Sequence, residues 1–232
     1  MPIAGFIRVD YCAHSIFSCL IFMIPLHIYL ARHGQDEDNA AIPPLLNGHR
    51  NQPLTAIGVE QANALATNVK GAGFSFDAVY SSPLQRAYKT AEAVTDALGI
   101  EKPIVIDALI ERDFGVMSGQ PATEILNLPP EDILITPTIN YFLRAEGAET
   151  FPDVIERVKV FLAELVTKHK EGDTVLLVCH GDTGKMIYAT FYGLDWREVL
   201  KQFHFGNSEL LLLSGDSPDE IVHVFRAAQY NA

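Results

Sequence analysis

Short apolar runs alternate along this chain with longer stretches in which apolar positions recur every three or four residues. The runs predict β-strands, and the longer stretches predict amphipathic helices. Alternation of strands with helices is typical of βαβ units, so it favours an α/β fold with a largely parallel sheet. We expect strands at residues 26–31, 78–81, 104–106, 174–179, 209–213 and 221–225, with helices between them.

Capping residues predict where three of the helices begin. Thr55 is expected to cap the first, Ser82 with Pro83 to open the second, and Thr150 with Asp153 to form a capping-box start for the third. The three helices are expected to end near residues 70, 98 and 169. The third carries its apolar residues on one stripe, which indicates that it covers the sheet.

Between Gly115 and Gly147 the periodicity is lost and four prolines occur, so we expect an irregular insertion with short helices. Such segments commonly cover the site in α/β enzymes. The last two strands, joined through the turn-rich residues 214–218, are predicted to form an antiparallel hairpin at the edge of the sheet. No linker-like composition divides the chain, so residues 26–232 are expected to form one domain.

Residues 1–25 precede the first predicted strand and are expected to form an N-terminal extension outside the domain. The apolar stretch at residues 16–24 is too short to span a bilayer. Because Asp10 offsets Arg8 and no A-x-A-like cleavage site precedes the first strand, a secretory signal peptide is the less favoured interpretation. We therefore expect a cytoplasmic protein that does not bind membranes. Export or anchoring by this segment, and Met23 as the working start, are the alternatives.

The composition is that of an ordinary globular protein, with 48% hydrophobic and 20% charged residues in a chain of 232. Its formal charge of −12, from 29 acidic and 17 basic residues, argues against a nucleic-acid-binding protein, which needs a basic face. An anionic substrate must then be held by local arginines. The three cysteines, Cys12, Cys19 and Cys179, show neither a disulfide framework nor metal-ligand spacing, and Cys179 is expected to be a buried core residue.

Residues suited to binding phosphate follow two of the predicted strands. Arg32 and His33 come directly after the first strand, and His180 comes directly after the strand at residues 174–179. Ligands bind at the strand ends of open α/β sheets, and the rigid guanidinium of arginine fits phosphate. The chemistry suggested is phosphoryl transfer to a histidine, although a lone histidine at a strand end is more often structural.

Two further strand ends bring an arginine and a carboxylate. Arg86 lies in the opening turn of a helix, where a cation does not stabilise the helix dipole, and anion binding beside the helix amides explains its position better. A solvated helix arginine is the alternative. Glu111 lies in the loop after the strand at residues 104–106, and taken alone it is an ordinary surface charge.

In content and order these segments resemble the motifs of the histidine phosphatase superfamily, also called the phosphoglycerate mutase-like family. The resemblance extends over nearly all of residues 26–225. It is carried by residues 30–34, Asn39, Gly48, residues 53–55, Gly58, residues 61–62, 80–87, 111–115, 147–150 and 179–181.

The resemblance implies a three-layer α/β/α sandwich with a mostly parallel central sheet and an antiparallel edge strand. It implies that His33 is the nucleophile, forming a phosphohistidine that water then hydrolyses. Arg32, Arg86 and His180 would form the phosphate pocket, with His180 also part of the catalytic set. Neighbouring arginines keep an imidazole unprotonated and stabilise charge on the phosphoryl oxygens, so no metal or other cofactor is required.

Glu111 matches the proton donor of the family, which protonates the leaving oxygen and later accepts a proton from the attacking water. Asp113, Asp182 and Glu149 are alternative acids. Asp182 lies two residues past His180, where a fixed negative charge would repel phosphate. We therefore prefer Glu111 as the catalytic acid.

Five other polar residues are weaker candidates. Asn39 matches a family position that binds phosphate, and Gln35 follows the first motif closely, but both side chains can equally stabilise a loop. His49 and Arg50 can meet a second anionic group of the substrate or be a solvated pair. His204 precedes a segment that resembles the last strand entry of the family, which borders the site. Structural roles suffice for the remaining histidines, which are His14, His27, His169 and His223.

Residues 35–38 read Gln-Asp-Glu-Asp, where the acid phosphatase and phytase branch extends its first motif as RHGxRxP. Gly181, rather than an aspartate, follows His180. The chain is therefore similar to the mutase-containing branch. Phosphoglycerate mutases carry a longer insertion with adjacent arginines, whereas Arg144 is the only arginine between residues 115 and 147.

We therefore expect a metal-independent phosphomonoesterase, a phosphoric monoester hydrolase that acts on a small phosphorylated metabolite or a phosphoprotein. A phosphoglycerate mutase-type phosphotransferase and a non-catalytic phosphate-binding protein of the same fold are the alternatives. Relatives with this core act on sugar phosphates, phosphoserine, nucleotide-pathway phosphates and phosphohistidine proteins, so specificity is expected to lie in the insertion.

Overall fold

A computed structural model describes residues 26–213 and 223–225, and the structural statements below concern these residues. Their main sheet has six strands in the order β3-β2-β6-β1-β7-β8. The strands are β1 (His27–Arg32), β2 (Ala78–Ser81), β3 (Ile104–Val105), β6 (Thr174–Cys179), β7 (Leu210–Leu213) and β8 (His223–Phe225). The first four in this order run parallel, whereas β7 is antiparallel to β1 and β8 is antiparallel to β7. The expected mostly parallel sheet with an antiparallel pair at its edge is confirmed.

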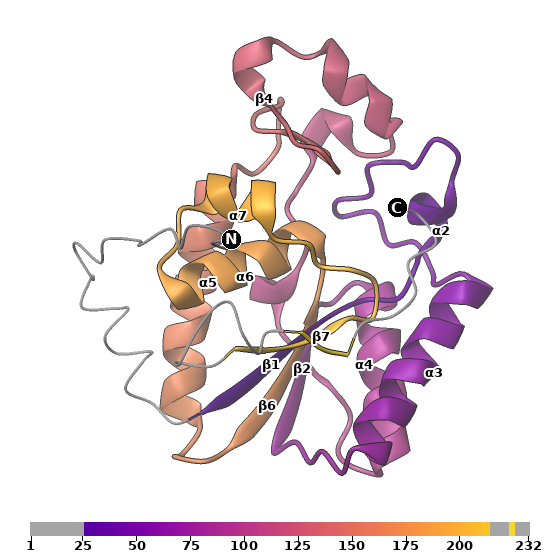
Figure 1. The fold of residues 1–232 in the computed structure, drawn as a ribbon, viewed down its shortest axis with the longest axis vertical. Coiled ribbons are helices and arrows are strands. Elements are labelled where there is room, and N and C mark those ends of the chain that lie inside the picture. The colour runs from indigo at the N-terminus through magenta and orange to yellow at the C-terminus, as the bar shows by residue number, and fades with distance from the viewer. Residues whose placement is uncertain (1–25, 214–222, 226–232) are drawn as a thin grey trace, which may run out of the picture.

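Helices cover both faces of this sheet and make three layers (Figure 1). The helices are α2 (Glu37–Ala40), α3 (Ala56–Gly71), α4 (Gln85–Leu98), α5 (Phe151–Lys168), α6 (Gly181–Tyr192) and α7 (Trp196–Gln202). On one face α3 and α4 pack on the sheet around a core that includes Leu65, Val94 and Val178. On the other face α5, α6 and α7 pack around a larger core that includes Leu162 and Cys179. Burial of these apolar faces is the main stabilisation of the fold.

Two of the three predicted helix starts are confirmed. The Thr55 hydroxyl accepts the Gly58 N–H, and Thr150 and Asp153 form the reciprocal capping box of α5. The prediction that Ser82 caps a helix is wrong, because α4 begins only after Leu84. The Ser82 N–H still bonds the Val178 carbonyl of the neighbouring strand, so the backbone is held in the sheet at this residue, and its hydroxyl accepts the Leu84 N–H instead.

The segment between Gly115 and Gly147 is an insertion with short helical turns, as expected. It contains three 3₁₀ helices and a hairpin of β4 (Ile133–Ile135) and β5 (Asn140–Phe142) that the sequence pattern did not predict. These elements lie beyond the central sheet at one end of the molecule (Figure 1). The 3₁₀ helices, with a further one that precedes the insertion, are Asp107–Leu109, Gly115–Met117, Ala122–Asn127 and Pro130–Asp132. A separate core of Phe114, Met117, Ile125 and Phe142 holds the insertion together.

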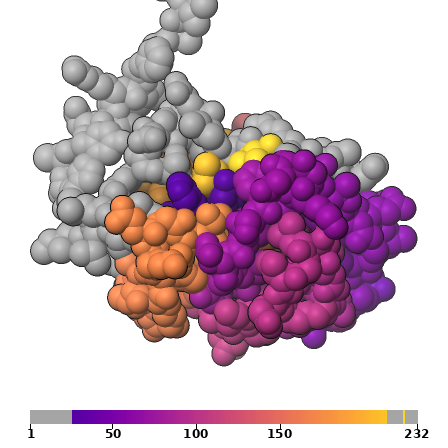
Figure 2. Space-filling model, turned by 90° about the horizontal axis from the view of Figure 1, so that it is seen from below, coloured from indigo at the N-terminus to yellow at the C-terminus, as the bar shows by residue number. Residues whose placement is uncertain are grey.

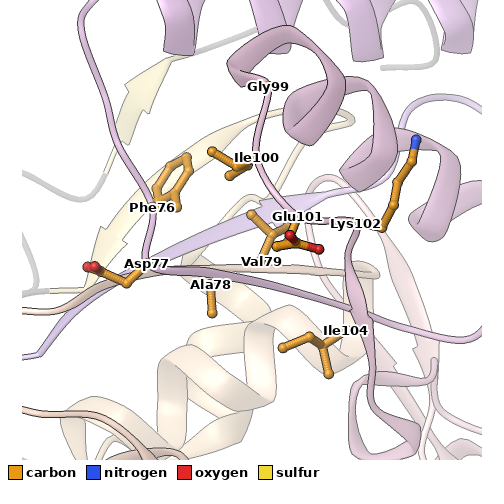
Figure 3. Close-up of a pocket in the computed structure, with 9 residues that line it drawn as sticks. All are labelled: Phe76, Asp77, Ala78, Val79, Gly99, Ile100, Glu101, Lys102 and Ile104. Carbon is orange, nitrogen blue, oxygen red and sulfur yellow. The ribbon is translucent and has the colours of Figure 1, made fainter.

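The opposite end of the molecule is seen in Figure 2, where the segments that precede β2 and β6 lie side by side. There the Thr174 N–H donates to the Asp77 carboxylate at 2.8 Å. A pocket of about 660 Å³ opens at this amino end of β2, lined by residues 76–79, 99–102 and Ile104 (Figure 3). None of the sequence-predicted site residues lines it.

The predictions for residues 1–25, which include Cys12, Cys19 and His14, lie outside the described residues. The turn at residues 214–218 and the start of the last predicted strand also lie outside them. Within the described part of the chain, no helix has the length and apolar character needed to cross a membrane. Cys179 is fully buried in β6, as expected of a core residue, and burial raises the pKa of its thiol.

Candidate active site

The parallel strands β1, β2 and β6 are neighbours, so the segments that follow them meet at one edge of the sheet. His33 directly follows β1 and His180 directly follows β6, and the His33 N–H donates to the Cys179 carbonyl at 3.0 Å. Ser82 directly follows β2, on the other side of β6. This edge is the place where open α/β sheets bind ligands. The two histidines predicted from separate motifs therefore lie together, with ring centroids 5.0 Å apart.

One imidazole nitrogen of His33 is fixed and the other is left free. Nδ1 lies 2.6 Å from the Gly34 carbonyl oxygen, and because a carbonyl only accepts, Nδ1 carries the hydrogen. Nε2 then holds a lone pair and has no hydrogen-bond partner among the described residues. Burial, and next the charges of Arg86 and Arg32, hold the pKa of His33 well below its usual range. The ring is therefore neutral near pH 7, as a nucleophile must be.

His180 is held in the opposite tautomer. The Arg86 Nε–H donates to its Nδ1 at 3.2 Å, so Nε2 carries the hydrogen and donates to the Ser82 hydroxyl at 2.7 Å. Burial is the main cause that lowers the pKa of His180, and the Arg86 charge adds to it. The serine that the sequence pattern assigned to a helix cap thus orients this histidine.

Arg86 is fully buried at the start of α4. Its Nε lies 3.2 Å from the Asp36 carboxylate, which is also fully buried. Its Nη1 and Nη2 donate to the carbonyls of Arg50 and Gly48, at 2.6 and 2.9 Å. The loop at residues 48–50 and Asp36 therefore fix the guanidinium in place. Sequence reasoning missed Asp36, because nothing in the local sequence marks this residue as the partner of Arg86.

Arg32 lies at the end of β1, and not all of its guanidinium N–H groups have a hydrogen-bond partner among the described residues. Nη1 donates to the Phe205 carbonyl at 3.0 Å, but Nε is buried and has no partner among the described residues. Buried donors are almost always paired, because an unpaired one costs free energy. The α-carbon of Gly181 lies close by, since a Cβ added there would be 3.7 Å from the Arg32 Cζ and 3.8 Å from Glu111 Oε2. The unsatisfied guanidinium makes this corner suited to an anion.

The carboxylate of Glu111 lies at the N-terminus of α6, the helix that starts after His180. Its Oε1 accepts the N–H groups of Arg112 and Thr183 and the Thr183 hydroxyl, at 2.9, 3.0 and 3.1 Å. Its Oε2 accepts one longer hydrogen bond, from the Asp182 N–H at 3.2 Å. Oε1 is therefore fully engaged, whereas Oε2 keeps the capacity to carry a proton.

The three alternative acids are engaged in ion pairs and turns. Asp182 lies 2.9 Å from Nε of the buried Arg112, and Glu149 lies 3.0 Å from Nε of Arg157. Asp113 accepts the Gly115 N–H at 2.9 Å. These contacts stabilise the loops around Glu111 and leave it as the carboxylate beside Gly181.

The weaker candidates have mixed surroundings. Gln35 is buried, its N–H donates to Gln61, and its amide oxygen accepts the Thr55 hydroxyl, which is the loop-stabilising role. Asn39 stands in α2 with a buried Oδ1 that has no partner among the described residues, so its binding of phosphate stays a prediction. The His49 Nε2 lies 2.8 Å from the Glu111 carbonyl, and Arg50 pairs with Asp38 at 2.8 Å.

The segment that follows α7 also contacts the site. The Asn207 side chain donates to the His33 carbonyl at 2.9 Å, and the Ser208 N–H donates to the Arg32 carbonyl at 3.0 Å. Ser208 has a φ of 53°, in the left-handed region, which indicates that these contacts fix a strained turn. The prediction that this segment, just after His204, borders the site agrees with these contacts. The structural role predicted for His169 also fits, because its ring lies 2.9 Å from the Tyr80 hydroxyl.

Gly58 in α3 lies very close to the backbone of the turn after β1, which contains Gly34. A Cβ on Gly58 would lie 1.9 Å from the Gln35 carbonyl oxygen, and one on Gly34 would lie 2.3 Å from the Gly58 carbonyl oxygen. Both obstacles are backbone atoms, which cannot rotate away. We therefore expect Gly58→Ala to lower the free energy of unfolding by about 2 kcal/mol or more, measured by urea denaturation.

Gly71→Ala is the matched control for this prediction, because no atom lies within 4 Å of a Cβ added at that exposed end of the same helix. It should change the free energy of unfolding by about 0.5 kcal/mol or less. Equal stability of the two variants would contradict the close approach.

Comparisons with known proteins agree with this geometry. A family model described as histidine phosphatase superfamily (branch 1) matches residues 28–225. A 2,3-bisphosphoglycerate-dependent phosphoglycerate mutase of Brucella anthropi is 33% identical over 178 residues, which are 75% of this chain and 85% of the relative. A mutase of the same description from Methylobacterium sp. is 31% identical over 175 residues, 74% of this chain and 83% of the relative.

Among solved structures, a mycobacterial glucosyl-3-phosphoglycerate phosphatase in complex with VO3 is 25% identical, with a TM-score of 0.68 over 81% of this chain and 92% of that chain. A phosphoserine phosphatase of Entamoeba histolytica in complex with 3-phosphoglyceric acid is 24% identical and shares the fold, with a TM-score of 0.68 over 89% of this chain and 100% of that chain.

Proposed function

This chain belongs to branch 1 of the histidine phosphatase superfamily, and on that premise we propose that it hydrolyses phosphate monoesters through a phosphohistidine on His33. One observation carries the proposal. The hydrogen bond from Nδ1 to the Gly34 carbonyl leaves Nε2 of a neutral imidazole with a free lone pair, in a pocket that also holds the unsatisfied Arg32 guanidinium. A nucleophile beside an unpaired cation is the arrangement that phosphoryl transfer needs.

In the first step the lone pair on His33 Nε2 attacks phosphorus and the bond to the ester oxygen breaks. Arg32 and Arg86 stabilise the charge on the transferring oxygens, since both lie close enough to His33 for their charges to lower its pKa. Glu111, protonated on Oε2, gives its proton to the leaving alkoxide and releases the alcohol. The Nδ1–H bond to Gly34 stabilises the positive charge that develops on the phosphorylated ring.

In the second step a water molecule attacks the phosphohistidine. The Glu111 carboxylate takes a proton from that water, the bond between phosphorus and Nε2 breaks, and inorganic phosphate leaves with His33 neutral again. Protein cations supply the electrostatic stabilisation in both steps, so we expect the reaction to proceed without an added metal ion.

Hydrolysis is favoured over mutase activity by the insertion and by the structural likeness to a phosphatase. The insertion supplies one arginine, Arg144, whereas a mutase must hold the substrate while the phosphoryl group is returned to it. The mutase names of the relatives in the sequence comparison support the second candidate, a bisphosphoglycerate-dependent mutase.

The test measures phosphate released from p-nitrophenyl phosphate and from 3-phosphoglycerate in the presence of EDTA. We expect release of inorganic phosphate with chelator present and without 2,3-bisphosphoglycerate. Conversion of 3-phosphoglycerate into 2-phosphoglycerate that requires the bisphosphate, with little phosphate release, would instead identify a mutase. Phosphate binding with neither reaction would identify a non-catalytic protein.

A further inference from the structure

A lysine that the proposed reaction does not use is buried in α6, the helix that begins after His180. Lys185 lies on α6, is 3% exposed, and its Nζ donates to the Tyr141 hydroxyl at 2.6 Å. The ammonium is also 4.9 Å from the centre of the Tyr141 ring. Tyr141 belongs to β5 of the insertion, so this contact joins the insertion to the helix that begins after His180.

Lys185 forms no ion pair with any described residue. The other buried cations around the site are paired: Arg86 with Asp36, Arg112 with Asp182, and the partly buried Arg157 with Glu149. Within the described part of the chain no carboxylate lies within 4.0 Å of Lys185, and Tyr141 is its one hydrogen-bond partner. A buried ammonium with one neutral partner is costly, because its other N–H groups lose their water. The Tyr141 O–H likewise has no acceptor there.

The Lys185–Tyr141 pair adjoins the phosphate pocket. Lys185 lies about one helical turn after Gly181 on α6, and a Cβ added at Gly181 would be 3.7 Å from the Arg32 Cζ, in the corner where Arg32 lacks a partner. Side chains on an α-helix lean toward its N-terminus, so Lys185 reaches back toward the first turn of α6 at Gly181. A ligand bound at Arg32 would therefore extend toward this pair.

We propose that Lys185 and Tyr141 form a second anion subsite that binds a carboxylate of the phosphate ester substrate. The inference rests on the proposed function and names its substrate class. The pair offers one positive charge with ammonium and hydroxyl donors, which matches a monoanionic carboxylate. A second phosphate fits less well, since Asp182 and Glu111 lie nearby and the neighbouring guanidinium of Arg112 is already bound by Asp182 and the Glu149 carbonyl.

The protonation of Lys185 gives the subsite a pH dependence. Burial lowers the pKa of Lys185 to about 8, an effect that Arg32 increases and that Asp182 and Glu111 oppose. Tyr141, the residue that faces it from β5, stays a neutral phenol because burial raises its pKa. A bound carboxylate favours the ammonium form. The preference for carboxylate-bearing esters should therefore be present below about pH 8 and be lost as the pH rises above that value.

The test compares ligands that differ in a carboxylate, using binding to the full-length His33→Ala protein by titration calorimetry. The pairs are 3-phosphoglycerate with glycerol 3-phosphate, and phosphoserine with phosphoethanolamine. We expect the carboxylate-bearing member of at least one pair to bind more tightly, by about tenfold or more. Adding Lys185→Met or Tyr141→Phe should reduce that ratio to near one, whereas Lys170→Met, at an exposed lysine, should not change it.

Both substitutions suit the interior, since methionine replaces a buried charge with an apolar chain and phenylalanine keeps the ring. Two results would overturn the proposed subsite. The first is an affinity ratio near one for both ligand pairs in the protein that keeps Lys185 and Tyr141. The second is an affinity ratio that neither Lys185→Met nor Tyr141→Phe reduces. Because the readout is binding, it decides this question even if the wild-type protein releases no phosphate, a result that would overturn the proposed function alone.

Discussion

Replacing His33 with alanine is expected to lower the rate of phosphate release by about 10⁴-fold or more, because the nucleophile is lost and water must attack the ester directly. The other groups of the pocket stay in place, since the backbone N–H and carbonyl of residue 33 keep their bonds to Cys179 and Asn207. Rapid quench of wild-type protein and ³²P-labelled ester in alkaline detergent should trap a phosphohistidine, which keeps its label in alkali and loses it in acid, and which the variant does not form.

His27→Ala is the matched control, because His27 lies on the same strand but is exposed at its opposite end. It should retain wild-type activity and labelling. Full activity of His33→Ala would refute the proposed mechanism. If the ³²P label were found on His180 instead of His33, His180 would be the nucleophile.

Replacing Glu111 with glutamine is expected to slow hydrolysis of alkyl phosphates by about 10²- to 10⁴-fold, because the leaving alkoxide loses its proton donor. p-Nitrophenolate leaves without protonation, so phosphorylation of His33 by p-nitrophenyl phosphate should persist. Breakdown of the phosphohistidine still needs a base. Stopped-flow absorbance should therefore show a burst of p-nitrophenol equal to the enzyme concentration, followed by a slow steady rate.

Glu149→Gln tests the alternative acid. Glu149 pairs with Arg157 and accepts the Asp113 N–H, so its loss should reduce stability without producing a burst. If the Glu149→Gln variant showed a burst and the Glu111→Gln variant did not, Glu149 would be the proton donor. If Glu111→Gln instead slowed the hydrolysis of alkyl and nitrophenyl esters equally, with no burst, then Glu111 would stabilise the start of α6 and would not transfer a proton.

The positions of the candidate residues that directly follow strands were predicted correctly from the sequence. The residues that orient them through hydrogen bonds and ion pairs were not. His33 and His180 were placed together correctly because parallel neighbouring strands bring their carboxyl ends to one edge. Ser82 was misassigned, since a serine before a proline has the local pattern of a helix cap, and its hydrogen bond to His180 spans 98 residues. Asp36 carries no local signal at all for its ion pair with Arg86. Local patterns report a residue's own element, whereas these contacts depend on how distant elements pack.

The same limit applies to the insertion. Its strands β4 and β5 have three residues each, too few for an alternating pattern to stand out. Their pairing is stabilised instead by the small core around Phe142, which also packs against the buried guanidinium of Arg112 at 4.0 Å. That guanidinium, although adjacent to Glu111 in the chain, was not a candidate, because nothing local distinguishes it from a surface arginine.

The separate core of the insertion bears on how relatives of this protein can diverge. Because Phe114, Met117, Ile125 and Phe142 form a core separate from the two cores of the sheet, we expect that the insertion can be exchanged or redesigned without rebuilding the sheet that carries the two histidines. The Lys185–Tyr141 contact is one of the places where the insertion meets the rest of the fold, together with backbone hydrogen bonds between Leu46 and residues 119–120. Engineering of a new substrate preference should therefore vary the residue at position 141 first and leave the strand ends unchanged.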